Sequence, residues 1–168
     1  MVDVNIRQVI KHDVGGCYRT ESACYTSDGA TREKILKRIM LFPKGFLIAE
    51  SDGEIIGLIN SASTDKEDIT DEALKDMVGH VKDGRNMVIF SLAVLPEFQG
   101  NGISKQLMVR FIEISRSLEK EKILLICKSD LIPFYQSFGF LYGGKSKSQH
   151  GGFEWHEMYL RLNAVDEI

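Results

Sequence analysis

Apolar and polar residues recur along this chain with the periods of short strands and amphipathic helices. They alternate over residues 2–10, which is the period-two pattern of a half-buried strand. Over residues 102–118 the apolar side chains recur at helical spacing and form one stripe, so this segment is the clearest helix of the chain. Residues 86–95 form a nearly continuous apolar run, which is typical of a strand buried on both faces.

The remaining segments continue this alternation of strands and helices. Asp52-Gly53 lies between two apolar runs and indicates a tight hairpin, because glycine accepts the positive φ of such a turn. The strand, helix and strand within residues 86–127 predict one right-handed parallel crossover. The sequence therefore predicts an α/β fold around a mixed sheet. The predicted strands cover residues 2–10, 46–50, 54–61, 86–95, 123–127, 140–142 and 153–162, and the predicted helices cover residues 13–25, 31–41, 71–78, 102–118 and 133–138.

Composition narrows the class of protein. The 168 residues, 43% hydrophobic and 27% charged, predict a single domain over residues 1–168 with a proper core. With a net charge of −3, the chain lacks the excess of basic residues that is typical of a nucleic-acid binder. No apolar run approaches the roughly 20 residues that span a bilayer. We expect a cytoplasmic monomer or homodimer with reduced thiols, no membrane partner and no metal, since no histidines or carboxylates have ligand spacing.

The connection at residues 96–104 joins the buried strand to the best helix. Gly100 and Gly102 let the backbone turn tightly and approach a ligand closely. The free N–H groups and the positive dipole end of the following helix both point toward this connection, and together they can bind a phosphate. A plain strand-to-helix turn is the alternative interpretation of the glycine spacing. The segment matches neither a Rossmann fingerprint nor a Walker loop.

Several segments together resemble a known family. Residues 99–104, Gln-Gly-Asn-Gly-Ile-Ser, resemble the Gln/Arg-x-x-Gly-x-Gly/Ala loop of the GNAT superfamily of acetyl-CoA-dependent N-acetyltransferases. Residues 90–96 look like the family strand whose splayed backbone holds pantetheine. Residues 133–140 resemble the arylalkylamine (serotonin-type) N-acetyltransferases, and residues 21–25 resemble the Glu-x-x-Cys-Phe segment of bacterial relatives of that group.

This sequence departs from the family pattern at two places. Ser104 stands where the superfamily usually has glycine or alanine, and its small hydroxyl leaves the loop amides accessible. Val88 and Phe90 stand where vertebrate arylalkylamine enzymes carry two histidines. A proton relay through those histidines therefore cannot operate here.

The resemblance implies the GNAT acyl-CoA N-acyltransferase fold, with about seven strands in a mixed sheet and helices on both faces. It also implies an enzyme that moves an acetyl group from acetyl-CoA to a primary amine, a small aryl- or alkylamine, by direct attack in a ternary complex. Two alternatives remain open at this point. One is an acceptor that is a polyamine, an amino acid or a peptide N-terminus, and the other is a catalytically silent acyl-CoA-binding domain.

The resemblance also assigns roles to individual residues. Tyr135 would donate a proton to the leaving thiolate, although it could instead be an aromatic anchor. Glu21 would be the general base, although it could equally be a solvated helix glutamate. Cys127 ends an apolar strand, so an acetyl-cysteine route is disfavoured. The expected cofactor-binding residues are Leu92, Ala93, Val94, Gln99, Gly100, Asn101, Gly102, Ile103, Ser104 and Tyr135, and the expected substrate-binding residues are Tyr25, Phe42, Leu92 and Ile126.

Overall fold

A seven-stranded mixed sheet forms the centre of the protein, with strand order β1-β2-β3-β4-β5-β7-β6. The computed structural model describes residues 2–26, 28–67, 72–148 and 150–162. Only β4 and β5 are parallel neighbours, and the other pairs are antiparallel. The strands are β1 (Asn5–Gln8), β2 (Leu47–Ser51), β3 (Glu54–Thr64), β4 (Asn86–Val94), β5 (Lys122–Cys127), β6 (Leu141–Lys145) and β7 (His156–Arg161).

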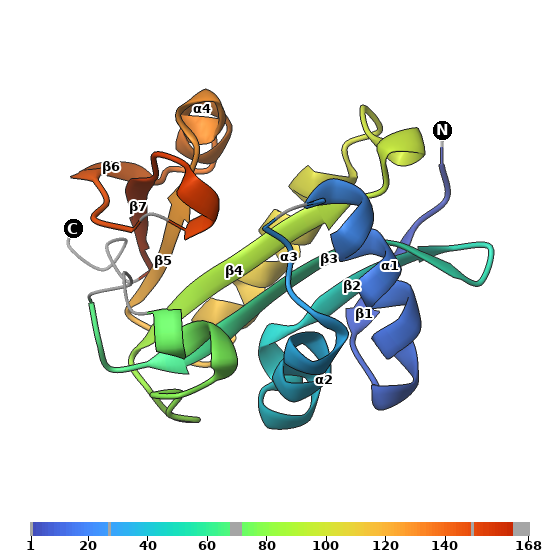
Figure 1. The fold of residues 1–168 in the computed structure, drawn as a ribbon, viewed down its shortest axis with the longest axis horizontal. Coiled ribbons are helices and arrows are strands. Elements are labelled where there is room, and N and C mark those ends of the chain that lie inside the picture. The colour runs from blue at the N-terminus through green and yellow to red at the C-terminus, as the bar shows by residue number, and fades with distance from the viewer. Residues whose placement is uncertain (1, 27, 68–71, 149, 163–168) are drawn as a thin grey trace.

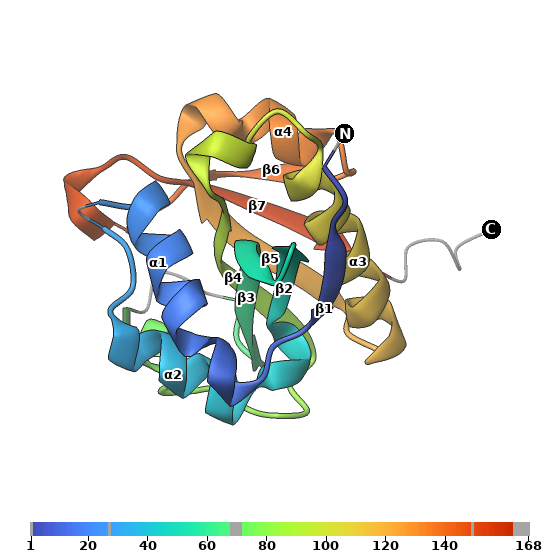
Figure 2. The ribbon, with the colours of Figure 1, turned by 90° about the vertical axis from the view of Figure 1, so that its right-hand side faces the viewer.

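Helices cover both faces of this sheet, as the sequence predicts. The α-helices are α1 (Val14–Cys24), α2 (Arg32–Leu41), α3 (Ile103–Ser117) and α4 (Ile132–Gln136). Helices α1 and α2 lie on one face and α3 on the other, while α4 lies beside β6 and β7 (Figures 1 and 2). Among the described residues, no helix is long and apolar enough to cross a membrane.

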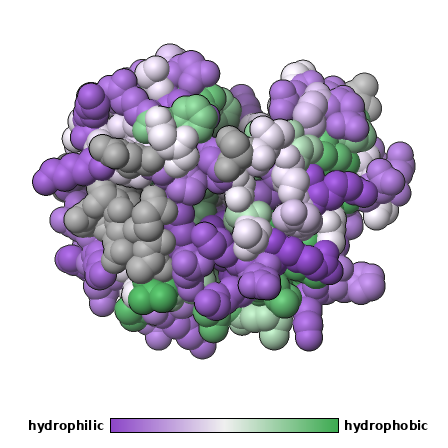
Figure 3. Space-filling model, in the orientation of Figure 1, coloured by the Kyte–Doolittle hydropathy of each residue, from purple (hydrophilic) through white to green (hydrophobic). Residues whose placement is uncertain are grey.

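Two apolar clusters hold these layers together. Leu107 and Phe111 of α3 are fully buried in the larger cluster, which confirms the apolar stripe expected over residues 102–118. Cys17 of α1 and Ile35 of α2 are fully buried in the smaller cluster on the other face. Hydrophilic residues cover most of the surface seen in Figure 3, and hydrophobic residues form only small separate groups there.

Several predicted elements differ from the observed ones. The last strand, predicted over residues 153–162, is His156–Arg161, and β3 and β6 extend to Thr64 and Lys145, beyond the predicted ends at residues 61 and 142. The first strand is shorter than residues 2–10, because β2 provides partners only for Asn5–Gln8. The segment predicted as a short helix over residues 71–78 contains a 3₁₀ helix at Glu72–Asp76, and Asp71 lies outside the described residues.

The feature that positions a site is the separation of β4 from β5. The two strands pair only from Asn86↔Lys122 to Val88↔Leu124, although each continues for several residues. On its other side β4 pairs with β3 up to Val94, with a bulge at Phe90, since Asn60 faces Ser91 and Ser61 faces Ile89. A wedge-shaped opening therefore forms between the carboxyl halves of two buried strands.

Candidate functional site

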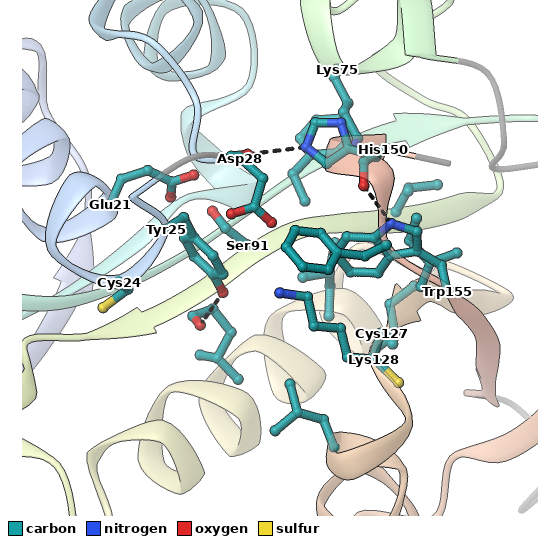
Figure 4. Close-up of a pocket in the computed structure, with 18 of the residues that line it drawn as sticks. Glu21, Cys24, Tyr25, Asp28, Lys75, Ser91, Cys127, Lys128, His150 and Trp155 are labelled. Atoms are coloured by element: carbon teal, nitrogen blue, oxygen red, sulfur yellow. Dashed lines mark hydrogen bonds between the residues drawn. The ribbon is translucent and has the colours of Figure 1, made fainter. Parts of the chain in front are cut away.

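A cavity of about 320 Å³ fills the opening between β4 and β5. This volume falls in the range of small-molecule sites. Its walls come from α1 and the segment after it, from both strands, and from the segment before β7 (Figure 4). The lining includes Glu21, Cys24, Tyr25, Asp28, Lys75, residues 88–92, residues 125–128, Asp130, Leu131, Tyr135, His150, Phe153 and Trp155.

Tyr25, at the end of α1, contacts the half of β4 that does not pair with β5. Its phenol donates a 2.8 Å hydrogen bond to the carbonyl oxygen of Leu92. Burial raises the pKa of Tyr25 well above its ordinary value, so the hydroxyl keeps its proton at neutral pH. The bond fixes the Leu92 peptide at the floor of the cavity and leaves this carbonyl with a permanent donor.

Glu21 is a buried carboxylate on the wall formed by α1. It is 3% exposed, and its Oε2 accepts a 3.0 Å hydrogen bond from the Ala30 N–H. Its Oε1 has no hydrogen-bond partner among the described residues. This oxygen is itself buried, and buried polar atoms are nearly always satisfied, so an unpartnered oxygen on a residue that lines the cavity marks where a ligand or a water molecule would complete the hydrogen bonding.

Tyr135 lies across the cavity from α1, on helix α4. It is 8% exposed and packs edge-on against Phe134 and Phe140, with ring centroids 5.1 and 5.8 Å apart. Burial raises the pKa of Tyr135 above its ordinary value, so it is a protonated donor at neutral pH. The aromatic packing expected as the alternative role is thus present, and the residue also lines the cavity.

A buried guanidinium supports β4 from behind. Arg38 of α2 is 3% exposed and stacks over the Phe90 ring at 4.5 Å, at the β4 bulge. It donates to Asn60 Oδ1 at 3.2 Å, and Asn60 donates in turn to Ser91 Oγ at 3.0 Å. Burial lowers the pKa of Arg38 to about 10, while the negative charge of Glu21 acts in the opposite direction. The network holds the bulge that shapes the cavity floor.

The glycine loop after β4 presents backbone amides to solvent. Gly100 and Gly102 have φ of +84° and +74°, and a Cβ at either position would meet nothing within 4 Å. Helix α3 has no side-chain cap, and its first backbone bond runs from Gln106 N–H to the Gly102 carbonyl. The amides of residues 103–105 therefore lack helical partners and form an open cradle that fits a phosphate.

Comparison with known proteins decides the family. A model of the acetyltransferase (GNAT) family matches residues 15–140. The chain belongs to this family. GNAT proteins of known structure share its fold. The loading GNATL domain of CurA from Lyngbya majuscula superposes with a TM-score of 0.84 at 17% sequence identity. The superposition includes 95% of this chain and 98% of that domain.

Two further GNAT relatives bear on the cofactor and the acceptor. The acetyltransferase yncA of Salmonella typhimurium, solved with its cofactor acetyl-CoA, superposes with a TM-score of 0.69 at 17% identity over 96% of this chain and 95% of that one. The serotonin N-acetyltransferase of Mesocricetus auratus is 28% identical over 112 residues, which are 66% of this chain. This chain covers only 53% of the length of that curated relative.

Both predicted catalytic residues and three of the four predicted substrate-binding residues lie around one cavity. Glu21, Tyr25, Leu92, Ile126 and Tyr135 all line the cavity. The described part of the chain holds no group of three or more histidine, cysteine or acidic residues able to bind a metal ion.

The predicted cofactor-binding residues would act through their backbone. The side chains of Ala93, Val94 and Ile103 are buried in the core, at 2–4% exposure. The Gln99 amide donates to the Val94 carbonyl at 3.0 Å, and the Asn101 amide donates to the Phe98 carbonyl at 2.9 Å. These two amides stabilise the shape of the GNAT loop, which leaves its main-chain N–H groups to face a ligand.

Phe42 is the one predicted substrate-binding residue that does not line this cavity. It caps the end of α2, is 3% exposed, and packs against the His80 ring at a centroid distance of 5.0 Å. Both rings lie away from the cavity lining. No residue of segment 39–46 lines the cavity, and the Phe42 ring is part of the larger apolar cluster instead.

The aromatic and charged residues from the segment before β7 and the end of β5 were not predicted as part of the site. Trp155 Nε1 donates to the His150 carbonyl at 2.8 Å, and His150 Nε2 donates to the Asp28 carbonyl at 3.0 Å, so the segment before β7 is joined to the segment after α1. Lys128 lies against this pair of segments. Only the glycine-rich composition near His150 could have signalled a loop here, and composition does not tell where a loop folds.

Proposed function

We propose that this protein is an acetyl-CoA-dependent N-acetyltransferase that acetylates a small primary amine, with aryl- and alkylamines as the acceptor class, by direct attack in a ternary complex. Membership of the GNAT family and the similarity to the hamster serotonin N-acetyltransferase support this proposal. The observation that carries the proposal is the cavity between β4 and β5, which is lined by the buried Glu21 carboxylate and the buried Tyr135 phenol.

The glycine loop and the start of α3 would hold the pyrophosphate of the acetyl donor. The donor supplies an activated thioester when it is bound, and the chain supplies amides at residues 103–105 and positive φ at Gly100 and Gly102. No cluster of basic side chains is required for this, because backbone N–H groups and the helix dipole provide the positive potential.

Glu21 would remove the proton from the amine. An alkylamine with a pKa near that of lysine, about 10.4, needs roughly 4–5 kcal/mol to be neutral at pH 7. A carboxylate with one oxygen unpartnered at the cavity wall can accept this proton directly or through a water molecule. The Ala30 N–H holds the other oxygen and fixes the orientation of the carboxylate.

Tyr135 would stabilise the departing thiolate. An ordinary phenol already has a pKa above that of a free thiol, about 8.5, and burial raises the pKa of Tyr135 further, so complete proton transfer to sulfur is uphill. The phenol therefore acts by donating a hydrogen bond to the developing negative charge. Backbone N–H groups near Leu92 would serve the developing oxyanion, on a peptide that Tyr25 keeps in place.

A covalent route through cysteine fits this site poorly. Burial raises the pKa of Cys127 to about 11. Burial also raises the pKa of Cys24, whose thiol donates to the Val94 carbonyl. The thiolate is the nucleophilic form, so neither cysteine is activated for attack on a thioester at neutral pH.

Release of free thiol from acetyl-CoA in the presence of a panel of amines tests the proposal. We expect thiol release that depends on both substrates and saturates with each, and an N-acetylated amine among the products. Tight acetyl-CoA binding without turnover of any amine would contradict the proposal and favour a silent acyl-CoA-binding domain. Preference for a polyamine or a peptide N-terminus would keep the chemistry and change the acceptor.

A further inference from the structure

Lys128 carries a positive charge into the cavity. It lies on the side formed by His150, Phe153 and Trp155, which we call the acceptor side. It follows the last residue of β5, and its ammonium lies 3.7 Å from the centroid of the Phe153 ring and 5.7 Å from that of Trp155. The two rings meet edge to face at 88° (Figure 4 shows Lys128 and Trp155). Distances below about 6 Å are those of a cation–π interaction, so the rings form a platform for this cation.

No carboxylate neutralises this cation within the part of the chain that the structure describes. The ion pairs given for those residues involve other lysines and arginines, and no acidic oxygen of a described residue lies within 4 Å of Lys128 Nζ. An ammonium has three N–H donors and no acceptor, and a ring face satisfies only one side of it. Lys128 therefore has donors left for an anionic group in the cavity.

The platform under Lys128 is fixed by hydrogen bonds to the opposite wall. Trp155 is held by the His150 carbonyl at 2.8 Å, and His150 is held by the Asp28 carbonyl at 3.0 Å. A cation that is already positioned loses less side-chain entropy when it binds a ligand than a freely rotating lysine does.

The charges around the cavity are divided between its walls. Glu21 and Asp28 bring carboxylates from α1 and the segment after it, whereas Lys128 brings an ammonium from the end of β5 (Figure 4). The other charged groups that line the cavity are Lys75, which follows β3, and Asp130, which is exposed beyond Lys128. The Glu21 and Asp28 carboxylates thus lie across the cavity from the Lys128 ammonium, and Lys75 is a second basic residue in the lining.

We propose that the amine acceptor also bears a carboxylate, as an amino acid does, and that Lys128 binds this carboxylate while the amine faces Glu21. This inference rests on the proposed acetyltransferase activity and replaces a plain aryl- or alkylamine acceptor by one that also bears a carboxylate. An amine without the carboxylate would leave the Lys128 donors unpaired in the ternary complex, whereas a zwitterion satisfies both walls.

Matched acceptors test the inference: phenylalanine against phenethylamine, and tryptophan against tryptamine. We expect the wild-type protein to have a higher kcat/KM for each amino acid than for the amine that lacks the carboxylate. In Lys128→Met the ratio of these kcat/KM values should fall roughly 10- to 100-fold, mainly through KM for the amino acid, because a hydrogen-bonded ion pair is lost. Lys128→Arg keeps the charge and the stacking and should retain most of the preference.

Lys122→Met is the matched control. Lys122 begins the same strand and pairs with Glu67 at 2.6 Å, six residues or roughly 20 Å from Lys128. Its replacement should leave the ratio of kcat/KM values unchanged. An unchanged ratio in Lys128→Met would overturn the inference while leaving the proposed activity intact, and so would acetylation of Lys128 itself by acetyl-CoA, since an acetylated lysine has no charge.

Absence of turnover with every acceptor would refute the proposed function instead. The binding role of Lys128 is then decided by calorimetry of phenylalanine and tryptophan with the CoA-bound protein. Binding that Lys128→Met weakens roughly tenfold or more, and that Lys122→Met does not, supports the carboxylate site. Binding that is equal in the three proteins overturns it.

Discussion

Replacing Glu21 by glutamine separates a catalytic carboxylate from a structural one. The side chain is 3% exposed, and its Oε2 accepts a hydrogen bond from the Ala30 N–H. Glutamine has the same shape, and its amide oxygen can accept that bond, so the fold should be preserved. An uncharged amide also avoids the cost of burying a carboxylate that has no ion-pair partner within the described residues.

The expected loss of activity follows from the proton that the amine must give up. General-base catalysis contributes roughly 10²- to 10⁴-fold, which is part of the roughly 4–5 kcal/mol needed to deprotonate an alkylamine at pH 7. We expect kcat/KM of Glu21→Gln to fall by about that factor at neutral pH. The loss should shrink as the pH rises toward the pKa of the amine, because the variant uses amine that is already neutral.

Thiol release measured across a pH series, with unfolding checked by circular dichroism, provides the assay. Glu113→Gln is the control, since Glu113 is an exposed glutamate on α3, on the other face of the sheet. If Glu21→Gln and Glu113→Gln have the same kcat/KM and the same pH profile as the wild-type protein, Glu21 is not the base.

Three further predictions concern the acid, the glycine loop and an ion pair. Tyr135→Phe should lower kcat roughly 10- to 100-fold by removing a hydrogen bond to the thiolate, and unchanged turnover would remove Tyr135 from the mechanism. Gly102→Ala and Gly53→Ala, at φ of +74° and +78° in open space, should each cost about 1–2 kcal/mol of stability, but only the former should weaken acetyl-CoA binding in calorimetry. Hydrogen bonds from Arg7 hold the pKa of Asp13 below its usual range, so Asp13→Asn should cost about 1–3 kcal/mol in urea unfolding at pH 7. The Asp13 contribution is present above the unfolded pKa and is lost as the pH falls through the lower folded pKa. A difference in stability between the two proteins that did not shrink as the pH fell below the ordinary aspartate pKa would therefore contradict this.

The strands and helices could be predicted because their signals are local. The apolar stripe of α3 and the apolar run of β4 are each contained in one segment, and both elements form within a residue or two of the expected limits. The Asp52-Gly53 turn is also local, and it joins β2 to β3 as expected. The hydrophobic pattern within one segment is therefore sufficient to predict such an element.

The acceptor side of the cavity could not be predicted in the same way, since long-range hydrogen bonds build it. His150 contacts Asp28, which lies 122 residues earlier in the chain, and this contact brings Trp155 and Phe153 toward Lys128. No pattern within residues 143–155 encodes that pairing. The opening between β4 and β5 has the same origin, because it depends on which strand residues remain unpaired beyond Val88.

The small net charge of −3 limits how such a site can select its acceptor. A zwitterion has no net charge, so the field of the whole protein neither attracts nor repels it strongly, and screening by salt at about 0.15 M removes most of what remains beyond roughly 8 Å. Selection must therefore come from groups in direct contact with the molecule, Glu21 at one end and Lys128 at the other. Because these groups are partly shielded from solvent, the preference for an amino acid over its carboxylate-free amine should vary little with ionic strength. A preference that disappeared in moderate salt would instead point to long-range repulsion of the cationic amine by exposed basic side chains.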